Sequence, residues 1–199
     1  MRLKWLAFTM LAALTLAGCG GLSYYNGKAY HNPEEALKAY RADLNDRLAS
    51  IAPTGNRIGG KALVALPNTA ILVEAFLSGA KENPPLFAPE DYEDDLPLTA
   101  ARADAHYGFM ADALKKRGVF DDVTVIRSDA PEKADIAGYD YLIYLSVPGP
   151  YKDQWYIRFG KNAPMPIYLD YSIERSPERD VRRTNAWLMS IEQLVAEVK

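Results

Sequence analysis

The run from residue 139 to 147, YDYLIYLSV, is the feature that most limits what this chain can fold into. Aromatic and β-branched side chains dominate it, as they do in β-strands. Its strand-like alternation places five apolar side chains on one face: Tyr139, Tyr141, Ile143, Leu145 and Val147. Pro148-Gly149-Pro150 follows and ends the pattern. The run therefore predicts the strongest strand of the chain.

Further stretches have strand patterns. Lys61–Pro67 follows the turn-forming pair Gly59-Gly60 and is apolar on both faces, which is typical of a central strand covered by helices. Residues 119–126 end in a run of β-branched residues, which predicts a strand. Residues 155–159 and 167–173 both alternate, and the hairpin-like connection 160–166 separates them.

A first helix is predicted after Asn32, which is a good N-cap. Pro33 suits the first helical position, and Glu34 and Glu35 suit the positive end of the helix dipole. Its apolar stripe comprises Leu37, Tyr40, Leu44, Leu48 and Ile51. We expect this stripe to dock on the sheet, with partner binding as the alternative.

Two more helices have clear boundaries. Residues 99–117 have helical spacing, and Gly118 is well placed as a C-terminal cap. Ser176-Pro177-Glu178 opens a carboxy-terminal helix. The predicted buried stripe of that helix comprises Val181, Leu188, Ile191, Leu194 and Val198. Residues 68–79 are ambiguous, and we favour a helix capped by Asn68 or Thr69 over a strand.

The order of these elements is α-β-α-β-β-β-β-α. It predicts an α/β (α+β) fold with a single mixed sheet of about five strands covered by helices. The amino-terminal and carboxy-terminal helices pack on that sheet, and its antiparallel strands come toward the end of the chain. We expect one domain over residues 33–199.

Residues 82–98 interrupt these patterns with four prolines and the acidic run EDYEDD. Such punctuation predicts a long exposed loop. Carboxylates in this number suggest calcium, but the spacing does not match an EF-hand and the central glycine is missing. A solvated acidic loop is the better interpretation, and a loop of this length is also a candidate partner surface.

Composition narrows the function classes. The 199 residues carry 23 basic and 26 acidic side chains, a net charge of −3. This mild acidity argues against nucleic-acid binding, which usually needs a basic surface. Cys19 is the only cysteine, so no disulfide can form within the chain. Stability must come from packing, to which the 13 tyrosines can contribute.

The amino terminus resembles the signal peptide of a bacterial lipoprotein. Arg2 and Lys4 precede an apolar run of residues 6–16, which is too short to cross a bilayer. Leu16, Ala17, Gly18 and Cys19 then resemble a lipobox. The resemblance implies cleavage after residue 18 and a diacylglycerol on the Cys19 thiol, with an ordinary signal peptide as the alternative. Because Gly20 and not Asp follows the cysteine, it also implies the periplasmic face of the outer membrane.

Residues 19–32 contain three glycines and show neither helical nor strand periodicity. We interpret them as a flexible tether between the lipid and the domain. We expect the tyrosines of this segment to pack on the edge of the domain, with contact with the membrane interface as the alternative: Tyr24, Tyr25 and Tyr30.

Three stretches resemble the small α/β domain of TolB amino-terminal and CsgG-like envelope lipoproteins. They are Lys61–Pro67, residues 111–126 with the turn LKKRGVF, and residues 139–147. The resemblance covers about half of the mature chain. It implies a non-catalytic periplasmic domain that docks on other envelope components. The chain lacks the long amphipathic transmembrane hairpin, so pore formation is not implied.

Catalytic signatures are missing from the sequence. There is no GxSxG elbow, HExxH pair or glycine-rich phosphate loop, and no second cysteine for redox chemistry. His31 falls in the tether, and His106 lies beside Tyr107 on a helix, where a surface or structural role is the better interpretation. A pair of glycosidase-type carboxylates would be invisible in the sequence. We therefore expect no enzyme, no cofactor and no metal.

Three functions compete on this basis. The first is a lipid-anchored, non-enzymatic envelope lipoprotein, an accessory or assembly subunit that meets the membrane through Cys19 and has a protein partner. The second is a periplasmic carrier or sensor of a small glycan or lipid, with Tyr141, Trp155, Tyr156 and Tyr168 lining a groove. Alternating aromatics on strands are also a common feature of cores. An envelope hydrolase is the third and weakest.

Overall fold

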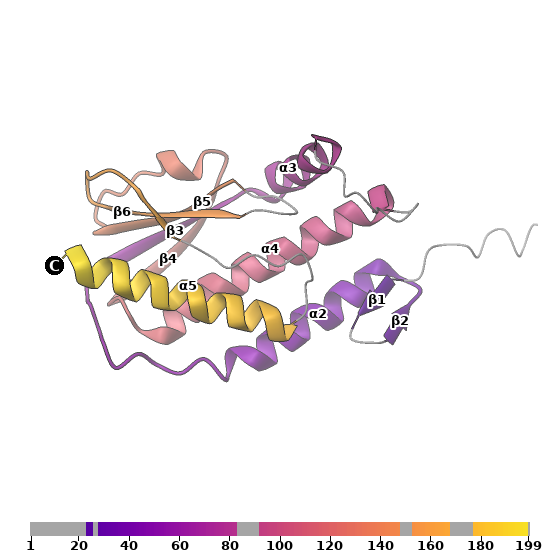
Figure 1. Ribbon diagram of the computed structural model, residues 1–199, viewed down its shortest axis with the longest axis horizontal. Coiled ribbons are helices and arrows are strands. Elements are labelled where there is room, and N and C mark those ends of the chain that lie inside the picture. Colours follow the sequence, from indigo (N-terminus) through magenta and orange to yellow (C-terminus); the bar gives the residue numbers. More distant parts are fainter. Residues whose placement is uncertain (1–22, 26–27, 83–91, 148–152, 168–176, 199) are drawn as a thin grey trace, which may run out of the picture. The chain divides into compact units, whose positions relative to one another are not determined.

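The computed structural model describes residues 23–25, 28–82, 92–147, 153–167 and 177–198 (Figure 1). The chain divides into two compact units, residues 1–39 and 40–199. Among the described residues, no helix is both long enough and apolar enough to cross a membrane.

In the first unit, β1 (Ser23–Tyr25) and β2 (Lys28–Tyr30) form a small antiparallel pair. Ser23 pairs with Tyr30, and Tyr25 pairs with Lys28. The Lys28 ammonium also lies 5.2 Å from the centre of the Tyr30 ring. The expectation that residues 19–32 have no regular structure is therefore wrong for these two short strands.

Helix α2 (Pro33–Leu48) begins in the first unit and continues into the second. Its predicted N-cap is confirmed, since the amide of Glu34 donates to the Asn32 side chain at 2.9 Å. Tyr40 and Leu44 are buried as expected. Leu37 and Leu48 are only half-buried, and Ile51 lies beyond the end of the helix.

The second unit contains a mixed sheet of five strands in the order β4-β3-β5-β6-β7. The strands are β3 (Lys61–Pro67), β4 (Asp122–Ser128), β5 (Tyr141–Val147), β6 (Gln154–Phe159) and β7 (Met165–Ile167). β3 runs parallel to both β4 and β5, whereas β6 and β7 continue the sheet in antiparallel fashion. The predicted fold class is confirmed.

β3 is an inner strand, and every residue from Ala62 to Leu66 is at most 2 % exposed. As predicted, β3 is apolar on both faces because both of its faces are covered. β5 is also buried on both faces, because Leu142 and Tyr144 are covered as well as Ile143 and Leu145. The predicted face of Tyr141, Ile143 and Leu145 is buried, but Tyr139 lies before β5 and packs with Leu142 and Tyr144 instead, so its expected place on that face is corrected.

Three further helices belong to this unit: α3 (Thr69–Glu82), α4 (Tyr92–Arg117) and α5 (Pro177–Val198). The helix favoured for residues 68–79 is confirmed. α4 ends as predicted, with Gly118 at a φ of 70°. It starts earlier than predicted, so residues 92–98 of the expected loop are helical, while 83–91 lie outside the described residues.

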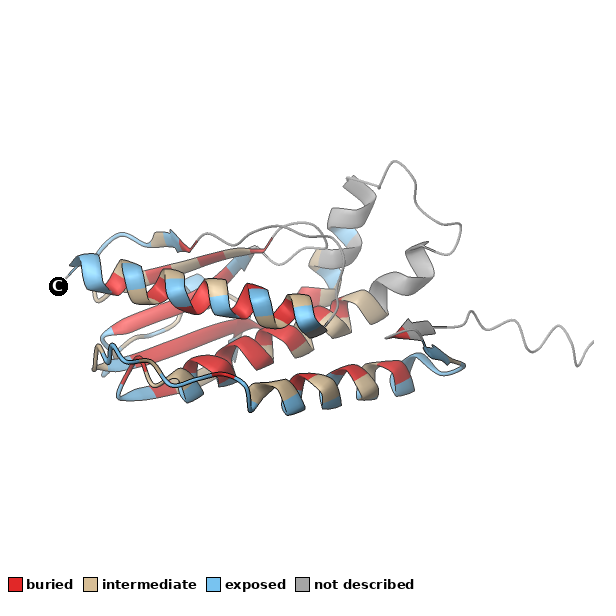
Figure 2. Ribbon diagram, turned by 60° about the horizontal axis from the view of Figure 1, so that its bottom comes forward, coloured by how far each residue is buried: buried red, intermediate tan, exposed pale blue. Residues whose placement is uncertain are grey.

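The two faces of the sheet have different covers. α4 and α5 lie along one face (Figures 1 and 2), where Trp155 of β6 contacts Trp187 of α5 with ring centres 5.1 Å apart. Over the other face lies the connection from β4 to β5, which includes a short 3-10 helix, η1 (Pro131–Lys133). Ala134, Ile136 and Tyr139 of this connection pack on a cluster comprising Leu63, Ala65, Leu142 and Tyr144.

The buried face of α5 differs from the prediction. Leu188 and Ile191 are buried as expected, but Val181 and Leu194 are half-buried and Val198 is 46 % exposed. The face that packs inward instead comprises Asp180, Arg183, Thr184, Trp187, Leu188, Ile191 and Val195. The helix buries a polar first half and an apolar second half.

The last predicted strand is only partly described. β7 begins two residues before the predicted start and includes Ile167, while residues 168–173 lie outside the described residues.

Candidate functional site

The residues predicted for lipidation, Leu16, Ala17, Gly18 and Cys19, lie outside the described residues, as does Tyr168. The other three predicted groove residues are described and do not line one surface. Trp155 and Tyr156 are neighbours in β6, so their side chains point to opposite faces of the sheet. Trp155 is 1 % exposed and packs between the rings of Tyr107 and Trp187. The expected aromatic groove is corrected on this geometry.

Tyr141 shares its face of the sheet with Trp155, but it lies at the other end of β5. It packs against Phe120 and Phe159, with ring centres 4.7 and 5.7 Å away. Burial raises the pKa of Tyr141 above its ordinary value of 10.0, and the nearby carboxylates of Asp140 and Asp121 add to the effect. Tyr141 is therefore a residue of the core.

Tyr156 lies on the opposite face and stacks on Tyr144, with ring centres 5.5 Å apart and planes at 17°. Burial is the main cause that raises the pKa of Tyr144 above 10.0. Tyr156 and Glu132 raise it further, whereas Arg158 lowers it. Tyr156 thus contributes mainly to packing on the face that the β4–β5 connection covers.

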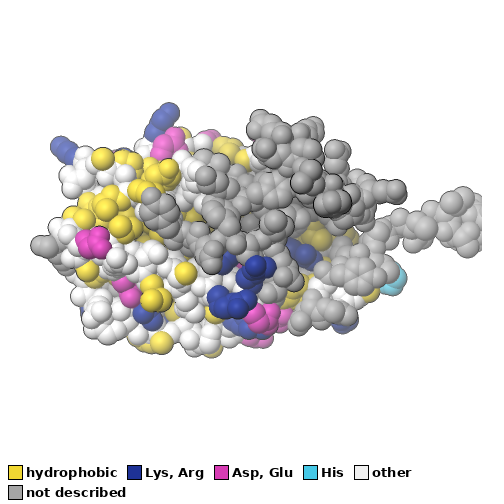
Figure 3. Space-filling model, viewed as in Figure 1, with side chains coloured by type: hydrophobic (Ala, Val, Ile, Leu, Met, Phe, Trp, Pro, Cys, Tyr) yellow, Lys and Arg dark blue, Asp and Glu magenta, His cyan; other side chains and the backbone are white. Residues whose placement is uncertain are grey.

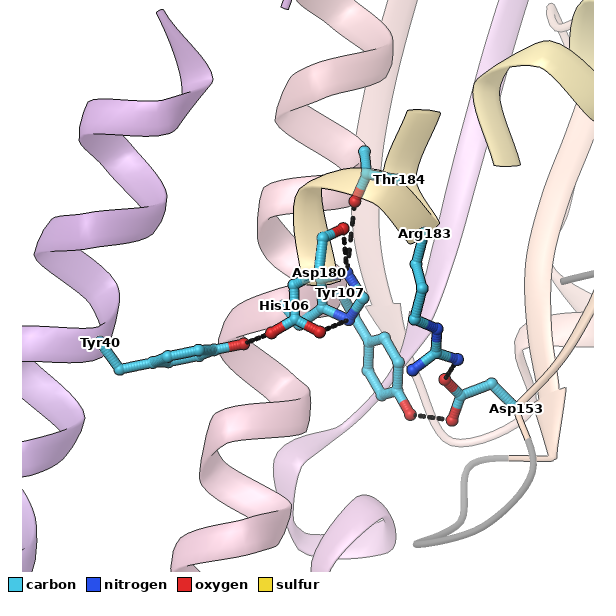
Figure 4. A network of polar contacts seen from close by, with 7 residues as sticks. All are labelled: Tyr40, His106, Tyr107, Asp153, Asp180, Arg183 and Thr184. Carbon is cyan, nitrogen blue, oxygen red and sulfur yellow. Dashed lines mark hydrogen bonds and ion pairs between the residues drawn. The ribbon is translucent and has the colours of Figure 1, made fainter. Parts of the chain in front are cut away.

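A polar network that the sequence did not predict lies inside the second unit (Figure 4). Its members come from α2, α4, α5 and the residue before β6: Tyr40, His106, Tyr107, Asp153, Asp180, Arg183 and Thr184. Each is at most 8 % exposed. Because burying polar groups without partners is costly, their mutual contacts are what make this burial possible.

One half of the network centres on Asp180. The Tyr40 hydroxyl donates to one carboxylate oxygen of Asp180, and the other oxygen lies 3.6 Å from Nδ1 of His106. Nε2 of His106 lies 3.2 Å from both the Asp180 carbonyl oxygen and the Thr184 hydroxyl. A carbonyl oxygen only accepts, so we assign the Nε2 hydrogen to that contact. These contacts join α2, α4 and α5.

The other half centres on Asp153, immediately before β6. One oxygen of Asp153 accepts from the Tyr107 hydroxyl, and the other accepts from the guanidinium of Arg183 at 2.9 Å. Charge-assisted hydrogen bonds of this kind are stronger than neutral ones. They connect the sheet to α4 and α5.

Thr184, His106 and Asp180 are a hydroxyl, an imidazole and a carboxylate in contact, the groups of a nucleophilic triad. Two observations argue against such chemistry here. Thr184 and His106 have no exposed surface through which a substrate could reach them. An Nε2 that donates to a carbonyl oxygen also has no lone pair with which to take the Thr184 proton. The arrangement fits a structural role, and the surface position considered for His106 is excluded.

The amino ends of the parallel strands are fastened by carboxylates. Asp121 accepts from the amide of Gly60 and Asp140 from that of Lys61, both at 2.8 Å. Gly60 has a φ of 81°, and a Cβ there would lie 2.8 Å from Asp140. Arg57 pairs with Asp121 at 2.9 Å. Backbone amides and Arg57 already contact the carboxylate oxygens of Asp121 and Asp140, so these two residues stabilise the turn before β3.

Two ion pairs connect the helices at the surface. Arg117 of α4 contacts Glu192 of α5 at 2.7 and 3.3 Å, and hydrogen bonding to Glu192 raises the pKa of Arg117, which partial burial lowers to a lesser degree. Arg47 of α2 pairs with Glu178 at the start of α5. Basic and acidic side chains also adjoin on the face shown in Figure 3. In the part of the chain that the structure describes, no three His, Cys, Asp or Glu residues gather as a metal site.

The network did have a signal in the sequence. Asp180, Arg183, Thr184 and Trp187 are spaced by three and four residues and continue the register of Ile191 toward the helix start. Polar residues in line with an apolar stripe indicate a buried polar cluster. Their partners on other elements are too far away in the sequence to be found from spacing.

No protein-family model, no curated protein and no solved structure matches this chain. The resemblance to TolB amino-terminal and CsgG-like domains therefore stays a prediction.

Proposed function

We propose that this protein is a lipid-anchored, non-enzymatic envelope lipoprotein, an accessory or assembly subunit at the periplasmic face of the outer membrane. The observation that carries the proposal is the position of Cys19. It is the only cysteine of the chain, and it follows a basic start, a short apolar run and two small residues.

The energetics of the anchor support this proposal. Each buried methylene contributes about 0.8 kcal/mol, a single acyl chain holds a protein only reversibly, and two chains hold it stably. A diacylated Cys19 would thus anchor the domain, and the described residues contain no helix that could do so.

The interior of the domain supports a non-enzymatic role. The described residues that most resemble catalytic groups, His106, Asp180 and Thr184, contact one another inside the domain and are at most 1 % exposed. Because these groups stabilise the interior, we infer that the domain acts through its outer surface, by contact with other proteins.

The first test is metabolic labelling with a fatty acid in cells that express the chain or its Cys19→Ala variant. We expect label in the unaltered protein, together with sedimentation in the outer-membrane fraction. The variant should lose both label and sedimentation. Unlabelled wild-type protein, or a variant that stays in the membrane fraction, would refute the anchor.

The second test addresses the partner. Affinity purification from crosslinked cells should recover a stoichiometric envelope protein with the wild-type chain but not with Cys19→Ala. If anchored protein is recovered alone after crosslinking, the assembly role is refuted while the anchor stands.

A further inference from the structure

A groove of about 200 Å³ lies between α2 and α4 in the second unit. Its floor is apolar: Leu44 and Phe109 are buried there, and Leu48 is half-buried. By volume, the groove exceeds an apolar cavity of about 150 Å³ that holds benzene. A side chain as large as leucine or phenylalanine can therefore enter it.

Gly108 keeps this groove open. It lies in the interior of α4, where glycine costs about 0.5–1 kcal/mol relative to alanine. Neither usual reason for glycine applies, because Gly108 is not among the glycines with positive φ and a Cβ there would meet no atom within 4 Å. The packing of the domain thus leaves room for a side chain at Gly108, and glycine leaves that room empty.

Opposite charges stand at the two ends of the groove. α2 contributes lining residues from Arg41 to Leu48 and α4 from Ala105 to Asp112, which is roughly 10 Å along each helix. The helices run in the same direction (Figure 1), so Arg41 and Asp112 are at opposite ends. Both residues are exposed, and neither side chain has a hydrogen bond or ion pair with another described residue.

We propose that this groove binds a short zwitterionic peptide with a large apolar side chain at its centre. An extended tripeptide spans roughly 10 Å, the separation of the two charged ends. Its carboxylate would face Arg41 and its ammonium group Asp112, while the central side chain lies over Gly108. The amide of Asn45, midway along α2's wall, can hydrogen-bond a peptide group. All of these residues belong to α2 and α4, so the inference does not depend on the lipid anchor.

The test is isothermal titration calorimetry with the peptide Ala-Phe-Ala and the purified full chain, against titration of the peptide into the matched buffer alone. We expect saturable one-to-one binding. Gly108→Leu should weaken it at least tenfold, because the new side chain fills the groove. Arg41→Gln and Asp112→Asn should each weaken it about twofold to fivefold, as expected for an exposed charge pair.

Matched controls separate this site from general effects. Asp46→Asn on α2 and Lys115→Gln on α4 change exposed charges outside the groove and should leave binding within twofold. Thermal unfolding will check that each variant folds, and Gly108→Ala provides a smaller change at the same position. Ala-Ala-Ala should bind at least tenfold more weakly, and Ala-Phe-Ala with acetylated and amidated ends about fourfold to twenty-five-fold more weakly, because it lacks both charges.

Three results would overturn the proposal: no saturable binding to the wild-type chain, unchanged binding to folded Gly108→Leu, or equal binding of the end-blocked peptide. The last would identify an apolar crevice that does not recognise charge.

Discussion

At the scale of single residues, this protein buries charged side chains that depend on their partners. Asp153 and Arg183 form an ion pair with side chains 2 % and 9 % exposed. Such a pair can contribute little net stability because both charges lose water on burial, yet the loss of one partner is severe because it leaves the other charge unpaired. Asp180 is a buried carboxylate as well, and the hydrogen bond that it accepts from Tyr40 compensates part of its lost hydration.

We therefore expect Asp153→Asn to lower the free energy of unfolding by about 3–5 kcal/mol, since Arg183 then lacks its counter-charge. Chemical denaturation monitored by tryptophan fluorescence measures this. The exposed control Asp46→Asn should change it by no more than about 0.5 kcal/mol. The double variant Asp153→Leu with Arg183→Met should cost less than Asp153→Asn; an equal or greater cost would contradict our account.

A second prediction concerns the buried tyrosines. The pKa values of Tyr141 and Tyr144 are raised above 10.0 in the folded chain. The folded state thus keeps these protons at a pH where the unfolded chain releases them, so their stabilising contribution is complete below pH 10 and is lost as the pH rises through the folded pKa.

Measured by urea denaturation, the free energy of unfolding should fall as the pH rises above 10. Tyr144→Phe should make this fall shallower, because phenylalanine has no proton to release. Tyr141→Phe should make the fall shallower in the same way, because the pKa of Tyr141 is raised as well. An unchanged slope in Tyr144→Phe would show that Tyr144 does not contribute.

At the scale of elements, α5 illustrates how a helix is oriented by its largest side chains. Trp187 is fully buried against Trp155, whereas Met189, two residues later, is 64 % exposed. Two positions along a helix differ by about 200° in direction, so only one of the two can face the sheet.

We expect Trp187→Ala to destabilise the protein by about 3–5 kcal/mol, since it leaves a cavity beside Trp155. Met189→Ala should cost no more than about 0.5 kcal/mol. Thermal or urea unfolding of both variants provides the comparison. Similar losses in the two would mean that α5 has a different rotation.

At the scale of the whole second unit, stability should be greatest where both faces of the sheet are covered. β3 lies between β4 and β5 and is buried from Ala62 to Leu66. β7 has three residues, one of them exposed. Amides that open only on global unfolding exchange most slowly.

Native-state hydrogen exchange followed by mass spectrometry should therefore show the slowest exchange in peptides from β3 and β5, and faster exchange in β7 and at the end of α5. Peptides from β3 that exchange as fast as those from β7 would contradict the position of β3 inside the sheet.

The sequence by itself determined the types of most elements, the inner position of β3, the helix boundaries at Asn32 and Gly118, and the mixed sheet; the two short strands β1 and β2 and the first turns of α4 were not predicted. The predicted features follow from local rules: apolar periodicity, capping chemistry and turn residues act over a few neighbours. For the same reason, the lipobox proposed at Leu16, Ala17, Gly18 and Cys19 is a prediction from the sequence alone.

Only the tertiary structure decided which face of α5 is buried, that Trp155 belongs to the core, and that Tyr40, His106, Asp153 and Asp180 come together. Each of these depends on contacts between residues far apart in the chain. The spacing within α5 indicates which residues share a face, but it does not identify their partners on other elements. Burial also changes the preference of a polar side chain, because a carboxylate that favours water when alone is retained inside once Tyr40 or Arg183 satisfies it.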